Sequence, residues 1–209
     1  TWTAHLKAQG IKVVHVIANK KFALKCEEAG VDAIVAEGFE AGGHNGREET
    51  TTMVLIPIIR EATNLPLIAA GGIASGSSML ACFALGAEAV QMGTRFVASV
   101  ESSGHESFKS KVVNSEEGET MLMLKQLTPV RLMRNKFFNQ IAEAEAKGSS
   151  VEELKLILGR ARAKKGMFEG DMEEGELEIG QVSAAVRKII PAGEIVKEVW
   201  EEFLKAKRR

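Results

Sequence analysis

The sequence predicts an α/β fold in which parallel strands, buried on both faces, alternate with helices. Four short apolar runs recur at intervals of about 20 to 35 residues, and helical spacing or a glycine turn follows each run. Strands that are almost wholly apolar are typical of parallel sheets that helices cover on both sides. Either a doubly wound sheet or a β/α barrel satisfies this pattern, and two glycine turns late in the series favour the barrel.

The first strand–helix unit follows an N-terminal segment, 1–10, that has helical spacing and no strand before it. A β-branched run at 12–18 predicts the strand, and a helix predicted at 22–29 ends at Gly30, a residue suited to the end of a helix. Because Thr1 is not a methionine and the leading helix lacks its strand, we expect that the N-terminal part of a longer protein has been removed.

The second unit contains a strand at 32–36 and a helix at 52–63, with a glycine-rich loop at 38–46 between them. Cys26 and Cys82 lie in predicted helices beside small apolar residues, without a CxxC spacing or a cluster of histidines. These cysteines are therefore expected to be buried structural thiols.

The third unit is the clearest of the series. Its strand at 67–70 ends on Gly71-Gly72, and a helix is predicted at 76–85. A fourth strand at 87–92 runs directly into Gly93-Thr94, after which the pattern changes. The chain therefore holds about four βα units.

From His105 onward the sequence is more charged and its spacing is helical. Helices are predicted at 130–147, 151–162 and 191–207, with an acidic, glycine-punctuated loop at 166–180. We therefore expect two domains: residues 1–104 as the C-terminal half of a TIM-type (β/α)8 barrel, and residues 105–209 as an α-helical extension that packs on it. Four strands cannot close an eight-stranded barrel by themselves.

The composition excludes several classes of partner. With 27 Lys and Arg against 28 Asp and Glu, the chain has no excess positive charge to attract nucleic acid or an anionic membrane surface. Its apolar runs are far shorter than the roughly 20 residues that span a bilayer. A cytoplasmic protein with small or locally matched partners is expected.

Two glycine turns predict a site for a phosphate group. Glycine at the end of a strand lets the backbone approach a ligand closely, and the N–H groups of the following helix can face an anion. Gly71-Gly72 meets this condition, and Gln91-Met92-Gly93-Thr94 meets it one unit later. The alternative is that glycine serves only the tight turns. Because loops after strands 7 and 8 of β/α barrels often hold a phosphate, the pair favours the ligand site.

A third glycine cluster, Gly38 to Gly46, follows the second strand and surrounds His44. Catalytic groups of β/α barrels lie at the carboxyl ends of the strands. Four glycines beside one histidine indicate a loop that lies against a planar ligand, with His44 able to exchange a proton near neutral pH. The alternative is a flexible loop with a surface histidine.

The remaining titratable residues point to structure rather than chemistry. His15 lies in a predicted strand and is expected to be a core histidine, with a catalytic histidine that points into the barrel as the alternative, whereas His5 and His105 are expected at the surface. The acidic run at 173–178 is most simply a solvated loop, with a cation site as the alternative, and no metal site is predicted.

Four motifs together resemble one flavoprotein family. AEGFEAGGHNG, TTTM, LIAAGGIASG and AEAVQMGTRF occur in that order, and the likeness extends over the whole chain. They are similar to the family that holds enoyl-acyl carrier protein reductase II and nitronate monooxygenase, once called 2-nitropropane dioxygenase. Members have an FMN-binding TIM barrel with a helical insertion or tail, and full-length members begin with strands that would precede Thr1.

The resemblance implies a role for each motif residue. His44 is the catalytic histidine, Gly42 and Gly43 lie by the isoalloxazine ring, and Glu37 stands where members place a flavin-contacting polar residue, commonly Gln. The FMN phosphate would meet these residues: Gly71, Gly72, Gln91, Met92, Gly93 and Thr94. Gly180-Gln181 resembles a tail segment that returns toward the mouth of the active site.

The leading hypothesis is an NAD(P)H-dependent reductase of trans-2-enoyl-acyl carrier protein in fatty acid biosynthesis, in which His44 polarises the thioester or protonates the α-carbon. The segment 47–53 is similar to the reductase branch of the family. The alternative is a nitronate monooxygenase that oxidises alkyl nitronates with dioxygen. A second alternative is an inactive truncated fragment that only binds a phosphate ligand.

The resemblance also implies the partners. These are a small-molecule or acyl-thioester substrate, the acidic acyl carrier protein and a second copy of the chain in a homodimer, because exposed apolar strand edges tend to associate. Basic side chains on the predicted tail helix, Arg131, Arg134 and Lys136, are candidates for contact with the carrier protein.

Overall fold

A computed structural model describes residues 2–208, so that Thr1 and Arg209, the outer limits of the two expected domains, lie outside the described residues. The chain divides into two compact units. The first runs from the N-terminus to Glu40, through Glu48–Met92 and from Glu198 to the C-terminus, and the second holds Ala41–Arg47 and Gly93–Lys197. The expected division between residues 104 and 105 stays a prediction.

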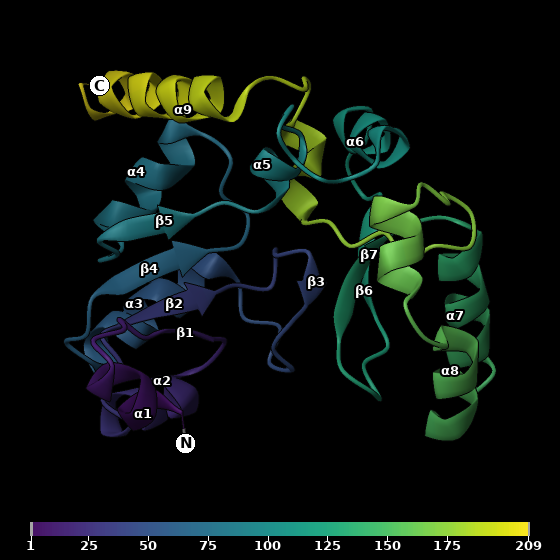
Figure 1. The fold of residues 1–209 in the computed structure, drawn as a ribbon, viewed down its shortest axis with the longest axis horizontal. Coiled ribbons are helices and arrows are strands. Elements are labelled where there is room, and N and C mark those ends of the chain that lie inside the picture. The colour runs from purple at the N-terminus through teal and green to yellow at the C-terminus, as the bar shows by residue number, and fades with distance from the viewer. Residues whose placement is uncertain (1, 209) are drawn as a thin grey trace. The chain divides into compact units, whose positions relative to one another are not determined.

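The first unit is built on a parallel sheet with the order β1-β2-β4-β5 (Figure 1). Its strands are β1 (Val14–Ile17), β2 (Ala33–Glu37), β4 (Leu67–Ala70) and β5 (Ala89–Gln91). The four strands expected from the sequence are therefore confirmed. Each strand lies beside the one that follows it in this sheet, whereas a doubly wound sheet reverses its order at a switch point.

The register of the sheet aligns the carboxyl ends of three strands. Glu37 of β2 pairs with Ala70 of β4, and Ala70 pairs in turn with Gln91 of β5. Because the strands are parallel, the segments that follow these residues leave the sheet at one edge. Gly71 and Met92 are thus the first residues beyond two neighbouring strands.

Four helices of the first unit follow the predicted segments. They are α1 (Thr3–Ala8), α2 (Lys20–Glu28), α3 (Thr52–Ala62) and α4 (Gly76–Ala84). The side chain of Asn19 accepts a hydrogen bond from the N–H of Phe22 and caps α2, while Ser75 caps α4. Local capping therefore fixes where α2 and α4 begin, whereas the N-cap residues of α1 and α3 form no side-chain cap.

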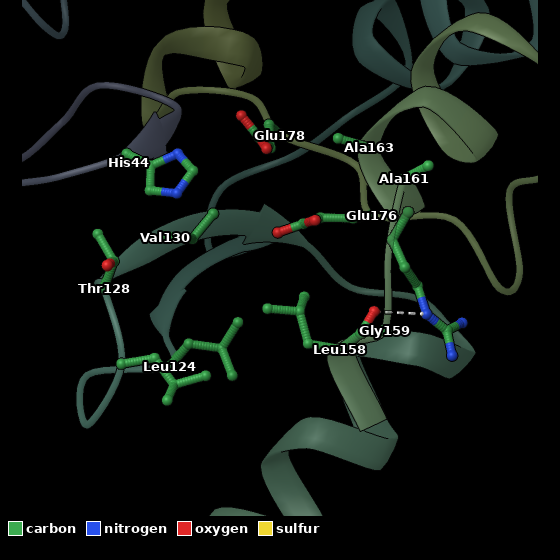
Figure 2. A pocket seen from close by; sticks show the side chains of 12 residues that line it. His44, Leu124, Thr128, Val130, Leu158, Gly159, Ala161, Ala163, Glu176 and Glu178 are labelled. Carbon is green, nitrogen blue, oxygen red and sulfur yellow. Dashed lines mark hydrogen bonds between the residues drawn. The ribbon is translucent and has the colours of Figure 1, made fainter. Parts of the chain in front are cut away.

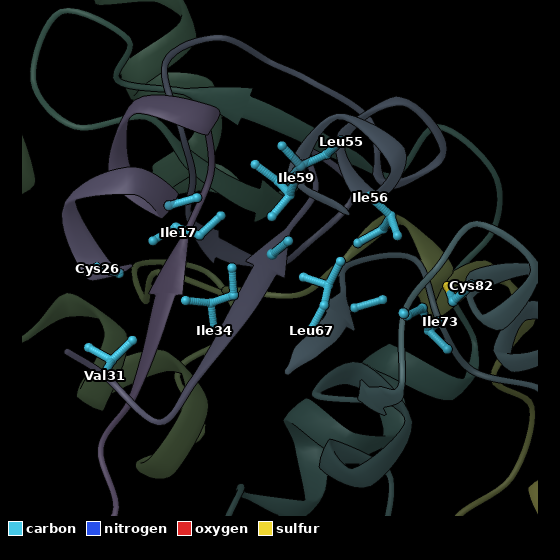
Figure 3. Packing of buried hydrophobic residues seen from close by; sticks show 14 residues of the cluster. Ile17, Cys26, Val31, Ile34, Leu55, Ile56, Ile59, Leu67, Ile73 and Cys82 are labelled. Carbon is cyan, nitrogen blue, oxygen red and sulfur yellow. The ribbon is translucent and has the colours of Figure 1, made fainter. Parts of the chain in front are cut away.

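The core of the first unit lies between the sheet and its helices (Figure 3). Ile34, Ile56 and Leu67 have no exposed surface, and both cysteines are buried and free, as expected. Burial raises the pKa of the Cys26 thiol, and burial together with the charge of Glu40 raises that of Cys82 to about 11. Both thiols are therefore unreactive structural groups.

The second unit contains a sheet that the sequence pattern does not predict. Strands β3 (Gly43–His44), β7 (Val130–Met133) and β6 (Thr120–Met123) form it in that order, and both pairings are antiparallel. The helix expected at 130–147 is wrong in its first part, because 130–133 is a strand whose four residues are buried. Asn135 caps the helix that follows, so that the helix begins at Lys136.

Short helices complete the second unit. They are α5 (Thr94–Val97), α6 (Glu106–Val113), α7 (Lys136–Ala146), α8 (Val151–Leu158), a π-helical turn (Lys164–Phe168) and a 3-10 turn (Gln181–Ala185). Helix α9 (Ala192–Lys207) ends the fold, and its part from Glu198 belongs to the first unit. Within residues 2–208 no helix is both long and apolar enough to span a membrane.

Candidate functional site

In the first unit, the Gly71-Gly72 turn lies at the carboxyl end of β4, beside the carboxyl ends of β2 and β5. Gly71 has a φ of 93° and Gly72 a φ of 71°. Residues that carry a Cβ rarely adopt this backbone conformation. A Cβ on Gly71 would lie 2.7 Å from the carbonyl oxygen of Gly38. Glycine is therefore required at Gly71 both by the backbone conformation and by the close approach of the next loop.

Two residues that were not predicted as site residues, Thr52 and Glu40, hold this turn in place. The hydroxyl of Thr52 lies 2.8 Å from the carbonyl oxygen of Gly71 and 3.0 Å from a carboxylate oxygen of Glu40, and the Thr52 N–H donates to the same carboxylate at 2.9 Å. Thr52 is buried at the start of α3. The sequence showed a TTTM motif here, but only the fold brings Thr52 to the glycine turn.

The first turn of α4 offers few donors to a ligand. The Ser75 hydroxyl accepts from the N–H of Ser78, and the carboxylate of Glu202 accepts from the N–H of Gly76 at 2.9 Å. The expectation that the helix after Gly71-Gly72 points its N–H groups at an anion is therefore wrong for Gly76 and Ser78. The turn itself, and not the helix, is the part of this segment that can bind a phosphate.

Glu37 and Gln91 lie in one row across this edge of the sheet, both in register with Ala70. Glu37 is partly buried, and burial raises the pKa of its carboxyl group. Gln91 is exposed. Five predicted site residues thus gather at one edge of the first unit: Glu37, Gly71, Gly72, Gln91 and Met92.

The second unit brings the other glycine residues against a tail segment, 178–180. A Cβ on Gly42 would lie 2.3 Å from the carbonyl carbon of Ile179, and the N–H of Gly180 donates to the hydroxyl of Thr94 at 3.1 Å. A Cβ on Gly93 would have no atom within 4 Å. Gly42 is thus needed for packing against the tail, whereas the space beside Gly93 is open.

Strand pairing and one asparagine position His44. Strand β3 pairs with β7 so that His44 lies opposite Val130. The side-chain amide of Asn45 donates to the carbonyl oxygens of Ala41 and Gly43, both at 3.0 Å, which closes the loop before the strand. The loop around His44 is therefore held by defined contacts and not flexible, whereas the His44 side chain is exposed, as the alternative of a surface histidine expected.

The His44 side chain lines a pocket of about 270 Å³ that lies wholly in the second unit (Figure 2). Leucine and valine side chains form its apolar wall, while a histidine, two glutamates and an arginine supply polar groups. The lining residues are His44, Leu124, Leu127, Thr128, Val130, Leu158, Gly159, Ala161, Arg162, Ala163, Glu176 and Glu178. A small number of polar groups in an apolar cavity is the usual form of a ligand site.

Two carboxyl groups in the pocket have altered acidity. Burial, and then the charge of Glu178, raise the pKa of Glu176 to about 7, although Arg162 acts in the opposite direction. Burial also raises the pKa of Glu178, while the charge of His44 lowers it. Glu176 is only 7% exposed, so the expectation of a solvated acidic loop is wrong at this position. Groups with shifted acidity in a cavity are candidates for function.

The guanidinium group of Arg162 is already committed to the protein. It donates to the carbonyl oxygens of Ile157, Leu158 and Glu174 at 2.7 to 3.1 Å, and it lies over the ring of Phe137. Its remaining capacity to bind an anion in the pocket is therefore small.

Three other sequence expectations can be compared with the structure. His15 is exposed on β1, so it is not a core histidine, because β1 is an edge strand among the described residues. His5 and His105 are exposed, as expected. Arg131 is 1% exposed, so it cannot contact a carrier protein, whereas Arg134 is exposed.

The sequence did not identify Glu176 and Glu178 as candidate site residues. Only the fold shows that both line the pocket and that Glu176 is buried.

Comparisons with known proteins place the chain beside nitronate monooxygenases. A family model described as nitronate monooxygenase matches residues 2–202. The nitronate monooxygenase of Paraburkholderia phytofirmans is 33% identical over 208 residues, which cover 96% of this chain and 57% of the relative. A probable nitronate monooxygenase of Staphylococcus aureus strain Newman is 40% identical over 127 residues, or 57% of this chain and 36% of the relative. The chain thus spans about a third to three fifths of the length of these curated relatives.

Two solved structures are similar along almost the whole chain. FabK from Thermotoga maritima is 40% identical with a TM-score of 0.92, and the match covers 99% of this chain and 66% of that one. A nitroalkane oxidase from Streptomyces ansochromogenes is 31% identical with a TM-score of 0.80, over 98% of this chain and 61% of that one. The α/β fold with its parallel sheet is therefore shared with both.

Proposed function

The chain belongs to the nitronate monooxygenase family, and from this premise we propose that it forms part of an FMN-dependent oxidoreductase. The observation that carries the proposal is the pocket beside His44, where an imidazole meets an apolar wall and two carboxyl groups, of which that of Glu176 is buried and that of Glu178 partly buried. Such a pocket suits a substrate with an alkyl or acyl chain and a centre that gains or loses a proton.

We propose further that the four parallel strands are half of a (β/α)8 barrel. Their consecutive order is the order of a barrel segment, and both edge strands, β1 and β5, have a free edge among the described residues. In this arrangement the segments after β4 and β5 would correspond to the loops after strands 7 and 8.

The glycine turns fit FMN as the cofactor. In the described part of the first unit the N–H group of Gly72 has no protein acceptor, which leaves it able to donate to a phosphate. In the described part of the second unit the N–H group of Gly93 also lacks a protein acceptor, and the space beside Gly93 is open. When bound, FMN would supply the hydride chemistry. The residues that would hold it are Glu37, Gly42, Gly43, Gly71, Gly72, Gln91, Met92, Gly93 and Thr94.

The reaction that we favour is the NAD(P)H-dependent reduction of a trans-2-enoyl-acyl carrier protein. His44 would hold, on a ring nitrogen, the proton that the α-carbon takes up, or would polarise the thioester carbonyl. The apolar wall of Leu124, Leu127 and Leu158 suits an acyl chain. A neutral thioester also avoids repulsion by Glu176 and Glu178, which an anionic nitronate would meet. Among the described residues that line the pocket, Arg162 already donates to three backbone carbonyl oxygens.

The second candidate is a nitronate monooxygenase. The family model and the curated relatives carry that name, and the similar nitroalkane oxidase supports it in the same way. In this case His44 would orient or deprotonate the nitro compound. We assign FabK to the reductase branch, and its higher identity and TM-score favour the first candidate.

One experiment separates the candidates. The protein is loaded with FMN and mixed without oxygen with NADPH, NADH or propionate 3-nitronate, and the absorbance of the flavin is followed by stopped flow. Bleaching by a nicotinamide, followed by reoxidation with an enoyl thioester, is the expected result. Bleaching only by the nitronate would sink the reductase. A colourless protein that takes up no FMN would support the fragment that merely binds a phosphate ligand.

A further inference from the structure

Strand β7 places His44 and Glu178 at neighbouring positions along one edge. His44 and Gly43 of β3 pair with Val130 and Arg131 of β7, and Glu178 forms the next antiparallel bridge, with Leu132. The N–H of Met133 donates to the carbonyl oxygen of Leu177 at 2.9 Å, which fixes the tail in this register. The tail segment therefore continues along β7 where β3 stops.

This register puts the two side chains on one face of the sheet. Residues directly opposite each other in an antiparallel pair point to the same face, and so do residues two apart in a strand. His44 is opposite Val130 and Glu178 is opposite Leu132, so His44 and Glu178 share a face. In an extended segment Glu176 points the same way as Glu178, and both line the pocket with His44 and Val130 (Figure 2).

The carboxylate of Glu178 also lies against the backbone of the histidine loop. A Cβ on Gly43 would be only 2.5 Å from a carboxylate oxygen of Glu178. The positive φ of Gly43, 76°, is a second reason for glycine at this position. Glycine therefore allows the carboxylate to reach the residue that immediately precedes His44.

We propose that Glu176 and Glu178 are positioning residues that share one proton and return a proton to His44 after it has given its own to the substrate. This inference rests on the function proposed above. In the step, the O–H bond of Glu176 breaks and its proton passes to the Glu178 carboxylate, which hands it on so that an N–H bond forms on the His44 ring. Solvent then reprotonates Glu176, so that one proton and no electrons move.

The charges around the pair agree with a shared proton. Glu176 is buried and Glu178 partly buried in one pocket, and repulsion between two such carboxylates favours a state in which one of them keeps its proton. Burial and Glu178 raise the pKa of Glu176 to about 7, and His44 favours the ionised form of Glu178. The other charged group that faces the pair, Arg162, is itself neutralised by Glu174 at 3.4 Å.

The test uses the full chain without flavin and does not depend on activity. The side-chain carboxyl carbons of glutamate are labelled with carbon-13 and titrated by NMR. We expect a carboxyl group that titrates near pH 7 in the unmodified chain and is absent in Glu176→Gln. In Glu178→Gln the pKa of Glu176 should fall, because a negative neighbour is lost, and in His44→Gln the pKa of Glu178 should rise.

A matched control and a clear refutation are available. Glu173 is exposed in the same acidic segment but outside the pocket, so Glu173→Gln should leave both titrations unchanged. If Glu176 and Glu178 titrate as ordinary exposed carboxyls, or if Glu178→Gln leaves Glu176 unaltered, the shared proton does not exist. The unmodified chain alone answers the first point, even if a variant does not fold.

A kinetic measurement then tests the role. In the flavin-loaded protein, Glu178→Gln should lower kcat for enoyl reduction with little change in KM and should alter the pH profile of kcat, whereas Glu173→Gln should do neither. If Glu176 and Glu178 titrate as a coupled pair but the unmodified protein reduces no enoyl substrate, the proposed function is rejected, while the shared proton of the two glutamates stands. Enoyl reduction with an unchanged pH profile in Glu178→Gln would reject the relay and leave the function.

Discussion

Replacing Gly71 with alanine should destabilise the first unit more than replacing Gly30, another glycine of that unit with a positive φ. An L-residue in the left-handed region loses about 1–2 kcal/mol, and forcing extra volume into a packed site costs roughly 1–3 kcal/mol more. Both terms apply to Gly71, because its φ is 93° and the new Cβ would lie 2.7 Å from the Gly38 carbonyl oxygen. We therefore expect a loss of about 2 to 5 kcal/mol.

The matched control is Gly30→Ala in the same unit. Gly30 has a φ of 73°, but a Cβ there would have no atom within 4 Å, so only the conformational term applies. For a chain of this size, each kcal/mol lowers Tm by about 2–4 °C. Thermal unfolding followed by circular dichroism should therefore show a Gly71→Ala decrease clearly larger than the Gly30→Ala decrease.

Equal decreases in Tm for the two variants would refute the reasoning. They would mean that the turn can move away from the Gly38 carbonyl at little cost. The hydroxyl of Thr52, which lies 2.8 Å from the Gly71 carbonyl oxygen, would then not hold the turn either. A Thr52→Val variant tests whether the Thr52 hydroxyl holds the turn, because it removes the hydroxyl while keeping the shape of the side chain. A lower Tm for this variant would show that the hydroxyl stabilises the turn.

Three further predictions concern capping, pH dependence and docking. Ser75→Ala should lower stability by about 1 kcal/mol through loss of the α4 cap, whereas Ser77→Ala should have little effect, as measured by urea unfolding. The pKa of Glu176 is raised to about 7 in the folded state, so between the ordinary glutamate pKa and about pH 7 the folded chain keeps a proton that the unfolded chain has lost. The free energy of unfolding should therefore fall as the pH rises through that range. Glu176→Gln should remove up to about 3 kcal/mol of this dependence, and an unchanged slope would contradict the assignment. Arg134→Glu should raise KM for an enoyl-acyl carrier protein but not for an enoyl-coenzyme A, with the exposed Lys207→Glu as control; equal effects on both substrates would end the docking idea.

The parallel sheet could be predicted because its signals are local. Each apolar run of the first unit is bounded by glycine or by a capping residue, as at Gly30 and Ser75, and the strand and helix limits in the structure agree closely with those segments. The glycine turn at Gly71 could be predicted for the same reason, since a strand that ends on two glycines indicates a turn with positive φ values.

The antiparallel hairpin of the second unit could not be predicted in this way. Its strands are four residues each, and the apolar residues of 130–133 fall in helical spacing with Phe137 and Ile141 of the following helix. What makes 130–133 a strand is pairing on both edges, with β6 on one side and β3 on the other. Such non-local hydrogen bonds override local spacing.

The sequence by itself determined where the strands of the parallel sheet and the glycine turns lie along the chain, and it singled out His44 as the candidate for exchanging a proton, because these inferences depend on residue type and on neighbours in the chain. Only the tertiary structure decided that Arg131 is buried and that Glu176 and Glu178 share a pocket with His44. The acidity of a carboxyl group depends on its burial and on nearby charges. Strand β7 brings these groups together, because it pairs with His44 of β3 and with Glu178 of the tail segment, which are more than a hundred residues apart in the chain.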